Sequence, residues 1–187
     1  MAWFVYNTDM DIKIKKWQEI SRETAFEKYG RKIEKINYKL PDGRVSDFYI
    51  KSEGIAAGIL AITKDNKVVV VKEFRPGPNE VLLEMPGGFV DPNEKPEDTI
   101  ARELLEETGY RGNVQFVTRT LDDAYSTMDR YCFVATDCEK ISEPKPSDKE
   151  FVEVELISIE EFRQNLKSGR MTDVEVGYLC LDHLNLL

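Results

Sequence analysis

The chain has little of what several enzyme and structural classes require. Its only histidine, His183, lies in the terminal segment, so no Ser-His-Asp or Cys-His machinery can be assembled, and we expect a surface or packing role for His183. The three cysteines, Cys132, Cys138 and Cys180, are odd in number and lack C-x-x-C spacing. That pattern fits neither a disulfide framework nor a zinc site, and it predicts buried or free thiols in a reducing cytosol.

Excess basic charge and long apolar runs are missing as well. The 26 Lys and Arg residues are outnumbered by 35 Asp and Glu residues, so the net charge of -9 disfavours nucleic acid and anionic membranes as partners. No apolar run approaches the roughly 18 residues of a membrane span, and residues 1–11 do not resemble a signal peptide. We therefore expect a cytoplasmic protein with no nucleic-acid or membrane partner. A small anionic substrate would still need local cations, which suggests bound divalent metal ions.

What the chain does contain is sufficient for one hydrophobic core. Its 187 residues are near the usual size of a single domain, and the composition, 41% hydrophobic and 33% charged, is that of a globular protein. A change in composition near Ser52 separates a polar N-terminal β region, residues 1–52, from a main domain, residues 53–187.

Hydrophobic patterning and turn residues predict the elements. A hairpin is expected over residues 36–50, with its turn at Pro41-Asp42-Gly43. Consecutive valines indicate that the strand at residues 68–74 is buried on both faces. Further strands are expected at residues 58–63, 81–85, 114–121, 131–136 and 151–157, and helices at residues 96–108, from Ser158 to near Gly169, and from Asp173 onward. Strands flanked by helices predict an α/β or α+β fold.

The clearest chemical signal surrounds the helix expected at residues 96–108, where Pro96 suits the first turn and Gly109 the C-terminal cap. The spacing is G-x5-E-x7-R-E-U-x-E-E-x-G-U, in which U is bulky and apolar. The residues that fill this pattern are Gly88, Glu94, Arg102, Glu103, Leu104, Glu106, Glu107, Gly109 and Tyr110.

Helical geometry explains how the glutamates could act together. At about 100° per residue, Glu106 and Glu107 fall within roughly 60° of Glu103, which predicts a carboxylate face. The opposite flank, expected to face the core, holds Ile100, Ala101, Leu104, Leu105 and Thr108. Like charges on adjacent turns repel, and a hard cation such as Mg²⁺ or Mn²⁺ removes that repulsion and prefers oxygen ligands.

Two flanking features favour metal binding over the alternative, a merely solvated charged face. Arg102 stands four residues before Glu106 and can pair with its carboxylate. Gly87 and Gly88 allow the backbone to approach a metal or a phosphate closely. The ordered spacing of glycines, arginine and glutamates therefore predicts a metal site.

The pattern is the signature of Nudix hydrolases, and the chain resembles the ADP-ribose pyrophosphatase branch of that superfamily along nearly its full length. The resemblance implies a Nudix-type α/β/α sandwich with a mixed sheet, and metal-dependent cleavage of a nucleoside diphosphate sugar such as ADP-ribose. Residues 68–76 resemble the segment that presents a phosphate-binding arginine, which is Arg75 here. Residues 83–88 resemble the segment whose backbone carbonyl binds metal, at Gly87; Glu84 either joins the metal or water network or faces solvent from a strand.

The resemblance also implies the catalytic carboxylates. The metal ligands of the branch fall on Glu103 and Glu107, with Glu106 completing the cluster. The base in such enzymes often lies on a mobile loop near the end of the domain, which residues 145–154 resemble. Glu150 is the leading candidate for the base, and the alternative is a charged residue at a strand edge.

The N-terminal β region is implied to exchange contacts within a homodimer. Aromatic residues of this region often stack on the nucleobase in relatives, and Phe48 and Tyr49 are the nearest candidates. The alternative is simple packing within the hairpin.

One departure concerns the substrate. Relatives that cleave ADP-ribose place a proline shortly after the signature, whereas this chain has none between Pro96 and Pro144 and has Tyr125 near that position. A tyrosine there resembles dinucleoside polyphosphate hydrolases, and sugar nucleotides such as GDP-mannose also stay open. A non-catalytic nucleotide-binding sensor is the alternative from another class, and the intact set of glutamates argues against it.

Overall fold

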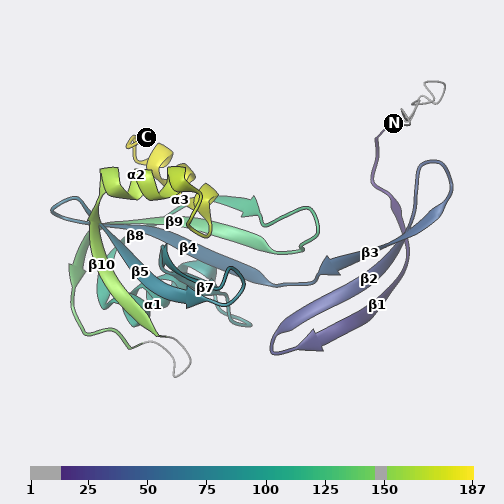
Figure 1. Ribbon diagram of the computed structural model, residues 1–187, viewed down its shortest axis with the longest axis horizontal. Helices are drawn as coiled ribbons and strands as arrows, with labels where there is room; N and C mark the ends of the chain where they lie inside the picture. Colours follow the sequence, from purple (N-terminus) through teal and green to yellow (C-terminus); the bar gives the residue numbers. More distant parts are fainter. Residues whose placement is uncertain (1–13, 146–150) are drawn as a thin grey trace. The chain divides into compact units, whose positions relative to one another are not determined.

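The computed structural model describes residues 14–145 and 151–187 and divides them into two compact units (Figure 1). The first unit contains the described chain up to Glu53 together with Tyr125–Thr127. The second contains Gly54–Ala124 and the described part of Met128–Leu187. Each unit has its own β-sheet.

The first unit is a three-stranded antiparallel sheet in the order β1-β2-β3. Its strands are β1 (Gln18–Lys28), β2 (Arg31–Lys39) and β3 (Val45–Lys51). The pairing of Lys39 with Val45 confirms the hairpin predicted around the Pro41-Asp42-Gly43 turn. Strand β1 was not predicted, because every one of its residues is exposed and no apolar alternation marks it.

A mixed sheet is the centre of the second unit. Within the described residues it has seven strands in the order β10-β5-β4-β9-β8, with β6 paired to β5 and β7 paired to β4. The strands are β4 (Ile55–Thr63), β5 (Lys67–Arg75), β6 (Glu80–Glu84), β7 (Gly87–Phe89), β8 (Tyr110–Leu121), β9 (Asp129–Lys140) and β10 (Val152–Ser158). Strands β4 and β9 run parallel, and the other pairs are antiparallel. All of these strands except the short β7 were predicted.

The helices are α1 (Pro96–Thr108), α2 (Ile159–Ser168) and α3 (Val174–His183), and all three confirm the predictions. Gly109 ends α1 in the left-handed conformation, and its N–H donates to the carbonyl of Leu105 at 2.8 Å. Ser158 and Glu161 form the predicted capping box at the start of α2. Asp173 precedes α3 with a φ of 55°.

The sheet separates two apolar layers. On one face, Val69 packs in a cluster with Ile100 and Leu104 of α1. On the other face, Val68 and Val70 pack in a cluster that includes residues of α2 and α3. Figure 1 shows α1 on one side of the sheet and α2 with α3 on the other, which confirms the α/β/α sandwich. Odd-numbered residues of β5 therefore face α1, because side chains alternate along a strand.

Two further properties bear on the sequence analysis. Cys132, Cys138 and Cys180 are free and buried, as predicted. In the described parts of the chain, no helix is long and apolar enough to cross a membrane.

Candidate active site

Two glycines bring strand β7 unusually close to β4. Gly87 pairs with Gly58, and Gly88 pairs with Ala57. A Cβ atom at residue 87 would lie 2.5 Å from the carbonyl oxygen of Ala57, so a larger residue cannot occupy this place without moving the backbone. At Gly87 the close approach is made to the backbone of a neighbouring strand.

The carboxylates of Glu103 and Glu107 lie against the same short strand. The N–H of Gly87 donates to Oε2 of Glu107 at 3.3 Å. A Cβ atom at residue 88 would lie 3.1 Å from Oε1 of Glu103, so only a glycine leaves that carboxylate its present position. The fold thus brings Gly87, Gly88, Glu103 and Glu107 together from β7 and α1.

The three glutamates predicted to bind metal differ in their surroundings. Glu107 is only 8% exposed, whereas Glu106 is exposed to solvent. Ala101, which was expected to face the core, is exposed. The prediction is therefore wrong for Ala101, whereas α1 packs on the sheet with Ile100 and Leu104 as expected. Strand β7 contacts the side of α1 that carries Glu107.

Arg102 connects three glutamates of the signature. It donates from Nη1 to Glu103 at 2.8 Å and to Glu106 at 3.0 Å, which confirms the predicted pairing with Glu106. Its Nε and Nη2 atoms donate to Glu94 at 3.2 and 3.0 Å, and Thr99 donates to Glu94 at 2.6 Å. Arg102 and Thr99 together lower the pKa of Glu94 to about 2. Arg102 therefore fixes several carboxylates whose mutual repulsion would otherwise spread them apart.

The donor atoms at this place suit a hard cation. Among the described residues, no three acidic, histidine or cysteine side chains converge closely enough to hold a metal ion by themselves. Two carboxylates beside a backbone segment are nevertheless the arrangement that Mg²⁺ uses, because it keeps several water ligands and takes others from substrate phosphates. Glu103, Glu107 and the backbone of Gly87 fit that requirement.

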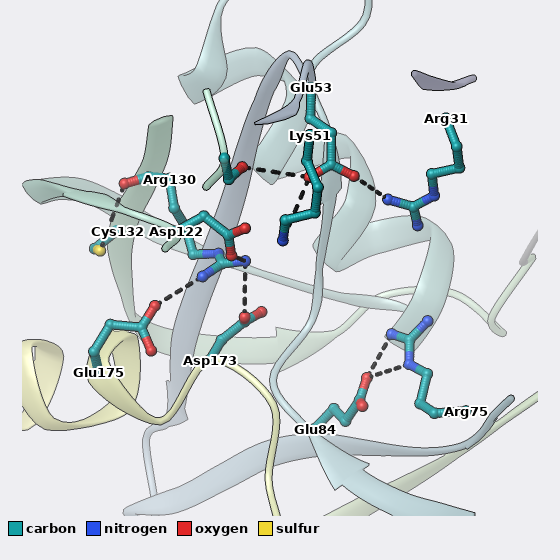
Figure 2. A network of polar contacts seen from close by, with 11 residues as sticks. Arg31, Lys51, Glu53, Arg75, Glu84, Asp122, Arg130, Cys132, Asp173 and Glu175 are labelled. Atoms are coloured by element: carbon teal, nitrogen blue, oxygen red, sulfur yellow. Dashed lines mark hydrogen bonds and ion pairs between the residues drawn. The ribbon is translucent and has the colours of Figure 1, made fainter. Parts of the chain in front are cut away.

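Arg75 ends β5 and is held by a buried carboxylate. Its Nε atom donates to Oε2 of Glu84 at 2.8 Å, and its Nη2 atom also donates to Oε2 (Figure 2). Nη2 also lies 3.2 Å from Glu73. Glu84 is 2% exposed, so the alternative of a solvent-facing strand residue is wrong. The hydrogen bond with Glu84 raises the pKa of Arg75, and Glu73 and Glu107 act in the same direction.

A second arginine cluster was not predicted. Arg130 of β9 contacts Glu175 at 2.8 Å, Asp173 at 3.1 Å and Asp122 at 3.2 Å (Figure 2). Burial alone would lower the pKa of Arg130, but these carboxylates outweigh it and raise the pKa. Burial raises the pKa of Asp173. The cluster joins β9 to the start of α3, and no local pattern could reveal it because its members are far apart in the sequence.

The predicted base-stacking residues belong to the first unit. Phe48 packs against the rings of Trp17 and Tyr38, with centroid distances of 5.7 and 5.9 Å. Tyr49 is 56% exposed and Tyr125 is 54% exposed. The carbonyl of Tyr125 accepts a hydrogen bond from the backbone of Lys51 at 2.8 Å. Glu150, the candidate base, lies outside the described residues.

Comparison with known proteins agrees with the signature. A model of the NUDIX domain matches residues 53–176. The ADP-ribose pyrophosphatase of Bacillus subtilis is 29% identical over 151 residues, which cover 79% of this chain and 81% of that protein. A methanol dehydrogenase activator of Bacillus methanolicus is 28% identical over 169 residues, which cover 87% and 91% of the two chains.

A solved structure supports the fold. A crystal structure described as that of an ADP compounds hydrolase is similar with a TM-score of 0.79 at 18% identity, covering 94% of this chain and 99% of the other. The family match spans most of the chain, and it includes β7 and α1, which carry the signature residues. The chain therefore belongs to the Nudix family and is a Nudix hydrolase.

Proposed function

We propose that the chain hydrolyses the diphosphate bond of a nucleoside diphosphate sugar, with ADP-ribose as the preferred substrate. The observation that carries the proposal is the placement of Glu103 and Glu107 against Gly87 and Gly88. Arg75 lies at the end of a strand on the sheet face that packs on α1, where its cationic side chain can serve the same substrate. Two carboxylates for a metal and one arginine for a phosphate suit a short anionic linker.

The residues that would hold Mg²⁺ or Mn²⁺ are Glu103, Glu107 and the Gly87 carbonyl, with Glu106 completing the cluster. When bound, the metal ion neutralises phosphate charge and stabilises charge that develops during displacement at phosphorus. Arg102 keeps Glu103 and Glu106 in place through its two hydrogen bonds.

The chemistry proposed for the remaining residues is a direct displacement by water. Arg75 donates hydrogen bonds to a phosphate oxygen and so holds the diphosphate in place for the attack on phosphorus. The water oxygen forms a new bond to phosphorus, the bridging P–O bond breaks, and the water proton passes to the carboxylate of Glu150. The products are a nucleoside monophosphate and a sugar phosphate.

The preference for ADP-ribose is supported by the similarity to the Bacillus subtilis ADP-ribose pyrophosphatase over about four-fifths of both chains. Tyr125, in place of a proline, is the feature that favours dinucleoside polyphosphates instead. The test is to compare kcat/KM for ADP-ribose, GDP-mannose, ATP and a diadenosine polyphosphate with Mg²⁺. We expect the highest value for ADP-ribose, and a clear preference for ATP or the diadenosine compound would refute the proposal.

The N-terminal β region, residues 1–52, is proposed to form a homodimer. Strand β1 is exposed along its whole length and pairs only with β2 within the described residues. Its Ile20 and Phe26 are 49% and 53% exposed, and an open strand edge with apolar side chains is suited to pairing with a second copy. Light scattering after gel filtration should give twice the mass of the 21.6 kDa chain, whereas a monomeric mass would refute the assignment.

A further inference from the structure

The carboxylate of Glu84 is buried more deeply than an ion pair with an accessible arginine requires. Glu84 is 2% exposed, and the side chain of Arg75 is 40% exposed. Both hydrogen bonds from Arg75 end on the same oxygen, Oε2. The other oxygen, Oε1, is buried and has no hydrogen-bond partner within the described residues. Within the described residues, only one of the two carboxylate oxygens of Glu84 is therefore hydrogen-bonded.

Such a group is costly for the fold. Moving a carboxylate out of water is unfavourable, and an apolar residue of similar size is often tolerated equally well or better in place of a buried ion pair. Glu84 pairs with Val71 across β5 and β6, so its side chain faces the apolar layer beneath α1. A leucine would suit such a position for packing alone. The benefit of a carboxylate must come from what it does to Arg75.

The contact controls which edge of the guanidinium remains accessible. Glu84 engages Nε and Nη2, and Glu73 lies near Nη2. In the described part of the chain, Nη1 has no hydrogen-bond partner and can donate to a phosphate oxygen. An arginine that is already held in place loses less side-chain entropy when it binds a ligand, an advantage of roughly twofold to tenfold in affinity.

We infer that Glu84 is a positioning residue, which holds Arg75 in the orientation that binds the diphosphate. The inference rests on the proposed function, because that function assigns Arg75 to a phosphate. The negative charge of Glu107 in α1 contributes to the raised pKa of Arg75, which agrees with their place on the same face of the sheet. Glu84 thus connects the phosphate-binding arginine to the strand that leads into Gly87.

The test is a double-mutant cycle with Glu84→Gln and Arg75→Gln. Turnover of ADP-ribose is measured with Mg²⁺, and the affinity for ADP-ribose is measured by calorimetry in EDTA, where no hydrolysis competes. We expect Glu84→Gln to raise KM and Kd by roughly tenfold or less with kcat changed by under about threefold. The double variant should be no worse than Arg75→Gln alone, because Glu84 acts through Arg75.

Glu155→Gln is the matched control. Glu155 pairs with Lys72 of β5, but Lys72 is an even-numbered residue and faces the α2 and α3 side of the sheet. This variant also removes one carboxylate from an ion pair on β5, and its KM and Kd should equal those of the wild type. A merely structural role for Glu84 would lower the melting temperature and leave both constants unchanged.

The outcomes separate the two proposals. If the wild type hydrolyses none of the four substrates named above, or clearly prefers ATP or the diadenosine compound, the proposed function fails. If the wild type hydrolyses ADP-ribose while Glu84→Gln matches it, or if the losses of the two single variants multiply in the double variant, only the role of Glu84 is overturned. If Glu84→Gln does not fold, Glu84→Asp is measured instead, because it keeps the negative charge but is shorter by one methylene. A raised KM in Glu84→Asp then supports the positioning role, and an unchanged KM overturns it.

Discussion

The contact between Gly88 and Glu103 predicts that a substitution at residue 88 lowers activity but leaves the stability of the fold nearly unchanged. In Gly88→Ala the new Cβ would lie 3.1 Å from Cδ and Oε1 of Glu103, so that carboxylate must retreat by a few tenths of an ångström. A displacement of about 1 Å at a reacting centre can cost about 100-fold in rate. If the logarithm of the rate falls in proportion to the displacement of the carboxylate, turnover with Mg²⁺ should fall by about fourfold to tenfold.

The same substitution should barely change stability. Residue 88 lies in strand β7 and does not have a positive φ, so alanine adds no backbone strain. The lower entropy of the unfolded chain stabilises the variant by about 0.4–1 kcal/mol. Crowding at the Glu103 side chain costs about 1 kcal/mol, which nearly cancels that gain. The melting temperature should therefore change by less than about 4 °C, as measured by circular dichroism.

Two other glycines provide controls for this experiment. In Gly58→Ala the Cβ would meet a side-chain carbon of Val176 at 3.6 Å, an ordinary contact, so activity should be retained. In Gly87→Ala the Cβ would lie 2.5 Å from the Ala57 carbonyl oxygen, so β4 and β7 must separate. The cost of about 2 kcal/mol corresponds to a drop of roughly 4–8 °C. Full activity in Gly88→Ala, or an equal loss in Gly58→Ala, would refute the reasoning.

Three further predictions concern single carboxylates. Glu103→Gln and Glu107→Gln should each retain the fold and lower Mg²⁺-dependent turnover by about 100-fold or more, so normal activity in either would remove that residue from the metal site. Glu150→Gln should lower kcat by roughly 10²- to 10⁴-fold with unchanged metal affinity, and a near-normal rate would assign the proton transfer elsewhere. The pKa of Glu94 is lowered from 4.5 to about 2, so its ionised form stabilises the fold above pH 4.5 and this stabilisation disappears as the pH falls towards 2. Urea unfolding of the wild type and Glu94→Gln should therefore differ at pH 6 and converge near pH 2, whereas a constant difference would contradict the assigned cause.

Local patterns in the sequence determined most of the secondary structure and the candidate metal residues. Pro96 and Gly109 mark the two ends of α1, and Ser158 with Glu161 marks the start of α2, because caps involve residues only a few positions apart. The spacing of the signature likewise predicted Glu103 as a metal ligand. These features need no knowledge of distant contacts.

Only the tertiary structure decided the surroundings of each charge. Helical periodicity gives the direction of Glu107 but cannot show that β7 covers it, because β7 reaches α1 through its pairing with β4. The burial of Glu84 follows from the pairing of β6 with β5. The local sequence alone allowed Glu84 to face solvent as well. The Arg130 cluster joins residues from β9 and the start of α3. Strand β1 forms by pairing with β2, and its own residue pattern does not predict it. Burial and ion pairing depend on non-local packing, and a single sequence carries no distance information between segments that the chain brings together only on folding.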